Sequence, residues 1–113
     1  IQGGLRLNDF TIKRGDSLPA IRYALEPATV DLTGATVRLQ MRVRNGAMVL
    51  DGLAAIVTAT GTPTVQYGWQ TGDTASAGRF EAEFRVTYSN GAVETFPNQG
   101  FILIRISDDV RAA

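Results

Sequence analysis

Apolar and polar residues alternate along most of this 113-residue chain. The clearest run is Val37–Val43, in which every second residue is apolar and the residues between are arginine or glutamine. A period of two is typical of a β-strand with one face buried and the other in water. The same pattern predicts strands at residues 10–13, 21–25, 65–69, 80–88, 92–96 and 101–106.

Turn-forming dipeptides separate these runs. Asn45-Gly46 and Asn90-Gly91 are strong hairpin signals, because both residue types adopt the backbone conformations of tight turns. The first hairpin predicts a short returning strand at 47–50. Asp51-Gly52 predicts a further turn, followed by a strand within 54–60.

The number and spacing of the strands indicate an all-β domain. Eight or nine short strands with turns every 8–12 residues or so predict an antiparallel sandwich or barrel. The sole candidate for helix is a single turn at Asp73–Gly78, capped by Asp73. We expect one domain at residues 9–110, preceded by a leader or tag remnant at 1–8 and followed by a tail at 111–113.

Composition removes several kinds of chemistry. The chain has neither cysteine nor histidine, so thiolate metal sites and a Ser-His-Asp triad are excluded within it. Its 11 basic and 11 acidic residues balance, which argues against a general nucleic-acid or anionic-membrane binder. We therefore expect no catalytic residues, no cofactor, no metal and no small-molecule substrate.

Two glutamates offer the one candidate for catalysis. Glu81 and Glu83 share a face of the strand at 80–88, roughly 6.5–7 Å apart, near the carboxylate separation of inverting glycosidases. Arg79 and Arg85 flank them on the same face, however. Alternating charge of this kind is typical of a solvated strand face, which is the interpretation we favour.

Three arginines form a second charged stripe. Arg38, Arg42 and Arg44 project from one face of the strand at 37–43, with no aromatic residues between them for base stacking. A stripe for an anionic ligand is one interpretation. We favour the other, in which Arg38 and Arg42 pair with Glu81 and Glu83 on a neighbouring strand.

The remaining candidates are weak. Asp108-Asp109 lacks the spaced oxygen ligands of a calcium loop. Tyr23, Tyr67 and Trp69 could form a platform for sugar stacking, but their alternation with polar neighbours favours burial in the core.

Four segments in order carry a family resemblance over roughly 100 residues: "FTIKRGDS" (10–17), "VDLTGATVRLQMR" (30–42), "VQYGWQTGDTASAGRFEAEFRVTYSNG" (65–91) and "ETFPNQGFILIRISDDV" (94–110). This order resembles the immunoglobulin-like N-terminal domain of baseplate upper proteins and related tail proteins of tailed bacteriophages. Asp73, Gly78 and Phe80 resemble the corner before strand F of immunoglobulin-like domains, but Phe80 lacks the tyrosine hydroxyl of that corner.

The resemblance implies an antiparallel immunoglobulin-like β-sandwich of about eight strands. It implies a structural assembly module in a virion, in a baseplate, tail tip or other tail component, that binds other phage structural proteins and forms a homo-oligomer. The expected docking residues are Ala47, Met48, Val49 and Leu50 on an edge strand, and Pro97, Asn98 and Gln99 in a loop. A carbohydrate-binding or adhesion module, with Trp69 or Tyr88 exposed in a groove, is the alternative.

Overall fold

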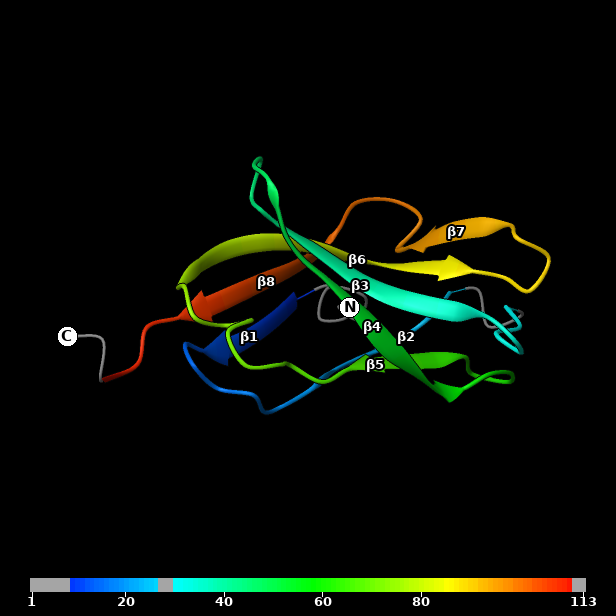
Figure 1. Ribbon diagram of the computed structural model, residues 1–113, viewed down its shortest axis with the longest axis horizontal. Helices are drawn as coiled ribbons and strands as arrows, with labels where there is room; N and C mark the ends of the chain where they lie inside the picture. The colour runs from blue at the N-terminus through cyan, green and yellow to red at the C-terminus, as the bar shows by residue number, and fades with distance from the viewer. Residues whose placement is uncertain (1–8, 27–29, 111–113) are drawn as a thin grey trace, which may run out of the picture.

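The computed structural model describes residues 9–26 and 30–110, so the expected leader at 1–8 and tail at 111–113 lie outside the described residues. This part of the chain is all-β, as expected (Figure 1). Its strands are β1 (Asp9–Lys13), β2 (Ile21–Ala24), β3 (Thr36–Val43), β4 (Met48–Thr58), β5 (Thr64–Tyr67), β6 (Gly78–Thr87), β7 (Val93–Phe96) and β8 (Ile102–Ser107).

The eight strands form one continuous sheet that curls into a nearly barrel-like shape. Seven of them follow the order β1-β8-β6-β3-β4-β5-β2, and β7 pairs with β6 beyond the end of β8. Every pairing is antiparallel except that of β1 with β8, which is parallel. The expectation of purely antiparallel pairing is therefore wrong for this pair. No hairpin joins β1 to β8, so turn geometry does not impose opposite directions on them.

The strand β4 joins the two parts of the sheet. Its first part, Met48–Ala54, pairs with β3, and its second part pairs with β5. The predicted turn at Asp51-Gly52 is wrong, because β4 runs straight through both residues. Asp51 binds Arg38 on β3, and Gly52 lies opposite Leu39. Asp51 and Gly52 locally prefer a turn. Side-chain pairing at Asp51 and close packing at Gly52 keep both residues in the strand.

Gly52 is required because the ring of Tyr67 lies directly over it. A Cβ atom at position 52 would lie 2.4 Å from Cε1 of Tyr67, closer than any normal contact. Tyr67, at the end of β5, is buried and meets Trp69 edge-on, with 5.5 Å between the ring centroids. The Trp69 Nε1 donates a hydrogen bond to the Pro19 carbonyl. This aromatic contact therefore connects β4, β5 and the segment that leads into β2.

The core lies between the two parts of the curled sheet, and the alternating pattern predicted its residues well. Phe84 at the centre of β6 is fully buried, and the Tyr23 ring of β2 stacks on it with 5.8 Å between centroids. The largest fully buried side chains are Phe84, Phe96, Leu25, Leu32, Leu39, Met41, Ile102, Ile104, Ile106, Val37, Val65 and Val86.

The loop between β5 and β6 contains turns instead of the predicted helical turn at Asp73–Gly78. The Asp73 carboxylate accepts hydrogen bonds from the Gln70 N–H and the Tyr67 hydroxyl. It is therefore bonded back toward β5 and does not cap a helix ahead of it. A tyrosine hydroxyl thus does anchor this corner, although it comes from β5 and not from β6. Thr74, which is buried, donates to the Asp16 carbonyl and so fastens the loop to the segment that follows β1.

The contact between Tyr67 and Gly52 generates a stability prediction. Gly52→Ala should lower the free energy of unfolding by about 2 kcal/mol, because the added methyl group overlaps the ring. The melting temperature should fall by roughly 10 °C in a thermal scan. Gly68→Ala is the matched control, because a Cβ atom there meets nothing within 4 Å. Equal effects of the two substitutions would contradict this account of Gly52.

Candidate functional site

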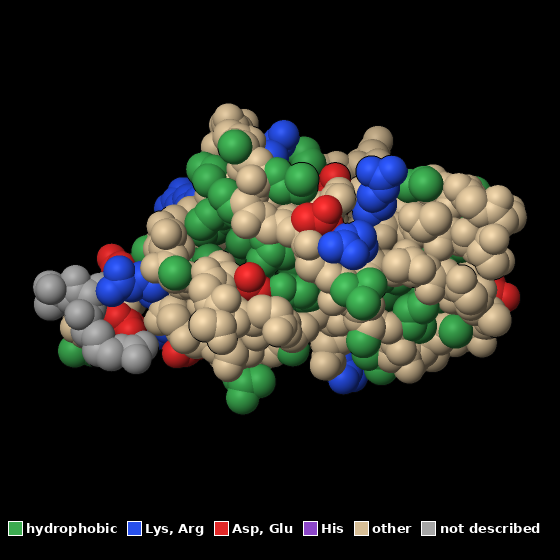
Figure 2. All heavy atoms as spheres, viewed as in Figure 1, with side chains coloured by type: hydrophobic (Ala, Val, Ile, Leu, Met, Phe, Trp, Pro, Cys, Tyr) green, Lys and Arg blue, Asp and Glu red, His purple; other side chains and the backbone are tan. Residues whose placement is uncertain are grey.

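Two ion pairs organise the exposed face of β3, β4 and β6, where basic and acidic side chains lie side by side (Figure 2). Arg42 binds Glu81 at 2.8 Å, which confirms the predicted pairing of these two residues. Arg38 instead binds Asp51 on β4 at 2.7 Å, because its direct neighbour on β6 is Arg85. The pairing that we expected between Arg38 and a glutamate of β6 is therefore wrong.

The surroundings of Glu81 and Glu83 suit a structural role better than glycoside cleavage. Glu81 is held by Arg42, and Glu83 lies opposite Gln40 in the register of β3 and β6. Both glutamates line a hollow of about 100 Å³, whereas ligand sites typically measure about 300–1,000 Å³. They also stand on one side of this hollow, whereas glycosidase carboxylates flank the scissile bond.

The first segment expected to dock partners is largely exposed. Ala47 lies in the loop of the β3–β4 hairpin, which projects from the body at the top of Figure 1. Met48 and Val49 follow at the start of β4 and are 59% and 53% exposed. Leu50 is only 8% exposed and lies opposite Met41 in the core, so it offers little surface to a partner. The alternation of β4 turns it inward.

The second expected segment is exposed but is fastened locally. Asn98 and Gln99 are exposed and Pro97 is half-buried. The Asn98 side chain donates to the Thr95 carbonyl and to Glu94, which keeps this loop against β7. None of the three lines the hollows around the hairpin. Phe101, just beyond them, has its ring 4.8 Å from the Arg42 guanidinium and shares a hollow with Met48.

Two groups of surface residues were missed by the sequence analysis. Val43 was assigned to the buried side of its strand, but it is 43% exposed because β3 runs past the edge of the core. Val43 and Val49 together line a hollow of about 320 Å³ against the β5–β6 loop. The second group consists of Arg44, Arg79 and Arg105, which come from three separate segments. Only the order of the strands in the sheet brings these segments together, so local sequence patterns could not predict the group.

The aromatic residues considered for sugar binding are buried or half-buried in the fold. Trp69 is only 4% exposed, and Tyr67 is buried as well, which confirms the prediction of burial for both. Tyr23 is half-buried. Tyr88 is also half-buried, and its hydroxyl donates to Glu94 at 2.8 Å. The adhesion alternative expected Trp69 or Tyr88 to be exposed in a groove, but Trp69 is buried and Tyr88 is only half-buried.

Neither a cluster of metal-binding side chains nor a membrane-spanning helix is present within residues 9–26 and 30–110. No group of three or more acidic side chains lies close enough to hold a metal ion within these ranges. The same residues include no helix with the length and apolar character needed to cross a membrane.

The three tyrosines generate a prediction about pH. Burial is the main cause that raises each phenol pKa, and a neighbouring carboxylate adds to it: Glu26 for Tyr23, Asp73 for Tyr67 and Glu94 for Tyr88. The pKa of Tyr88 rises to about 12.

Exposed tyrosines ionise near pH 10 or so, but these three tyrosines should still be protonated at that pH in the folded protein. Their contribution to stability is therefore complete below that pH and is lost as the pH rises through the folded pKa values. Ultraviolet absorbance should show phenolate in the folded protein only above the ordinary tyrosine range, with Tyr88 ionising near pH 12, and at lower pH only upon unfolding. A tyrosine that titrates at its ordinary pKa in folded protein would contradict this packing.

Comparison with known proteins returns no match: no family model matches the sequence, and no curated protein and no solved structure matches it significantly.

Proposed function

We propose that this chain is a structural assembly module of a tailed-bacteriophage or prophage particle, which acts through protein–protein contacts within the virion. The observation that carries the proposal is the apolar character of the projecting β3–β4 hairpin. Val43, Met48 and Val49, which we call the hairpin surface, are each more than two-fifths exposed. The resemblance of the sequence to baseplate upper proteins supports a phage tail as the setting.

Exposed apolar residues at a sheet edge favour a protein partner. Along Met48–Ala54, β4 pairs with β3 on one side and has no strand on its other side among the described residues. Figure 2 shows hydrophobic side chains gathered around the base of this hairpin. Contiguous apolar surface of this kind typically marks an interaction site.

The exposed edge of β4 favours contacts through side chains over the addition of a partner strand. The pairing of β3 with β4 shifts register between Met41 and Arg42, which leaves Val49 in a β-bulge. A bulge bends an edge strand and interrupts its row of hydrogen-bonding groups, so it disfavours the addition of a further strand. The hollow beside Val43 and Val49 can instead accept an apolar side chain of the partner.

For the finer fold we propose an immunoglobulin-like sandwich. Tyr23 on β2 stacks on Phe84 of β6 although these strands are not neighbours in the sheet, which supports two layers that face each other across the core. Residues that carry the resemblance, such as Asp73, Thr74 and Phe96, serve this framework. They therefore support a shared fold, whereas the exposed apolar surface is formed by Val43, Met48 and Val49.

The proposal predicts self-association through the hairpin surface, in keeping with the repeated copies of phage particles. Val49→Lys should weaken self-association about tenfold or more, because it places a charge in an apolar contact. Sedimentation velocity over a wide concentration range measures this effect. Val57→Lys is the matched control, because Val57 is an exposed residue near the other end of β4.

Equal effects of the two lysine variants would place the contact elsewhere. A wild-type protein that stays monomeric at all concentrations, and that binds none of the purified tail proteins encoded beside it, would overturn the assembly role.

A further inference from the structure

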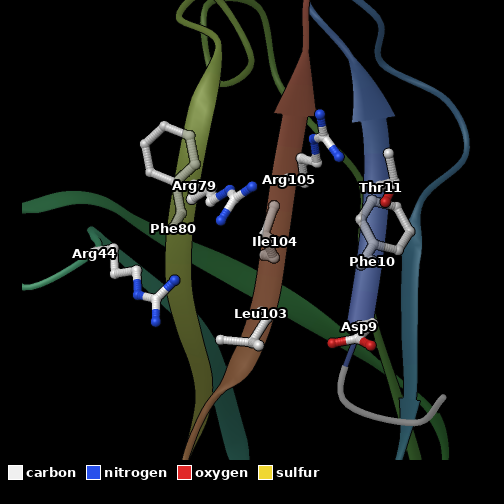
Figure 3. Close-up of a pocket in the computed structure, with 9 residues that line it drawn as sticks. All are labelled: Asp9, Phe10, Thr11, Arg44, Arg79, Phe80, Leu103, Ile104 and Arg105. Atoms are coloured by element: carbon white, nitrogen blue, oxygen red, sulfur yellow. The ribbon is translucent and has the colours of Figure 1, made fainter. Parts of the chain in front are cut away.

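Three arginines from separate segments line one pocket on the outer face of β1, β8 and β6. Arg79 is the second residue of β6, Arg105 lies on β8, and Arg44 lies in the β3–β4 hairpin loop. The Arg44 backbone N–H donates to the Arg79 carbonyl at 3.1 Å, which fixes the hairpin loop against β6 at this point. Figure 3 shows the three side chains around the pocket, with Arg79 extending from β6 toward β8. The pocket volume is about 270 Å³.

This arrangement of charge is unfavourable unless something neutralises it. Arg79 and Arg105 are direct partners in the register of β6 and β8, and like charges at such positions destabilise a sheet. No carboxylate among the described residues lies within 4 Å of Arg44, Arg79 or Arg105, although Arg38 and Arg42 nearby each have one. All 11 acidic residues of the chain fall in the described part.

The pocket is also composed like a ligand site. Thr11 supplies a hydroxyl group, while Leu103 and Phe10 supply apolar surface. The one acidic residue in the lining is Asp9. Three arginines and one aspartate leave two positive charges, so a dianion would balance the site. Guanidinium groups match the oxygens of phosphate through paired, charge-assisted hydrogen bonds.

We propose that Arg44, Arg79 and Arg105 form a binding site for dianionic phosphate, either inorganic phosphate or a phosphate monoester on a small molecule such as a sugar. A nucleic-acid backbone fits less well, because each of its phosphodiesters carries one negative charge and no aromatic stacking row accompanies the arginines. The site is independent of the assembly role, since it requires only the fold of one chain.

The test is a titration of isotope-labelled protein with inorganic phosphate at neutral pH and constant ionic strength, followed by NMR of the arginine side chains. The Nε–H signals of Arg44, Arg79 and Arg105 should shift together and saturate. Arg79→Gln and Arg105→Gln should each weaken binding about tenfold or more. Arg85→Gln, on the same strand as Arg79 but outside the pocket, should leave binding unchanged.

A second measurement, the melting temperature, distinguishes a loss of phosphate binding from a loss of folding. Without phosphate and at low salt, Arg105→Gln should melt at a higher temperature than the wild type, because it removes the repulsion from Arg79. Glucose 6-phosphate that binds more tightly than inorganic phosphate would support a monoester ligand, and equal binding would support phosphate alone. Dimethyl phosphate, a monoanion, should bind at least about tenfold more weakly than inorganic phosphate.

Three results would overturn the proposal. One is a set of shifts that grows without saturation and spreads over all arginines. The second is an equal loss of binding in Arg79→Gln and Arg85→Gln. The third is a single-stranded oligonucleotide that binds these arginines more tightly than inorganic phosphate at the same phosphate concentration, which would indicate a nucleic-acid site.

Discussion

The packing of the Tyr67 ring over the bare backbone of Gly52 is the contact on which the other parts of this structure depend. It holds β4 straight where the sequence favours a turn, and so lets one strand serve both parts of the sheet. The same ring bonds through its hydroxyl to Asp73, which closes the β5–β6 corner. Its edge contact with Trp69, which is bonded to Pro19, carries the constraint to the segment before β2.

The framework held by this contact adjoins the surfaces that we propose for function, because Asp73 also lines the hollow beside Val43 and Val49. The framework includes Asp73, Thr74 and Phe96, which are buried or hydrogen-bonded within the fold. The hairpin surface and the arginine pocket adjoin each other, because Arg79 and Phe80 line both the pocket and the hollow beside Val43 and Val49. Because the Arg44 backbone is bonded to β6, the two surfaces are fixed relative to each other. A partner on the hairpin and an anion in the pocket would therefore lie close together.

The sequence predicted the strands and the core because alternation is a local signal. It failed at Asp51-Gly52, where the turn preference of the dipeptide is overridden by Tyr67, 15 residues or so away in the chain. It paired Arg42 with Glu81 correctly but could not place Arg38, since register depends on tertiary packing. The arginine pocket was not foreseen, because a site built from three segments exists only once the strand order is known.

We propose that this chain meets its partners at the hairpin surface. A concentration series of amide NMR spectra tests it residue by residue in the unmodified protein. We predict that the amide signals of Val43, Met48 and Val49 shift or broaden first as concentration rises, while those of Val57 and Val93 stay unchanged. Spectra in which the hairpin signals stay constant while signals elsewhere change would contradict this proposal, and spectra that show no change at any concentration would contradict self-association through the hairpin.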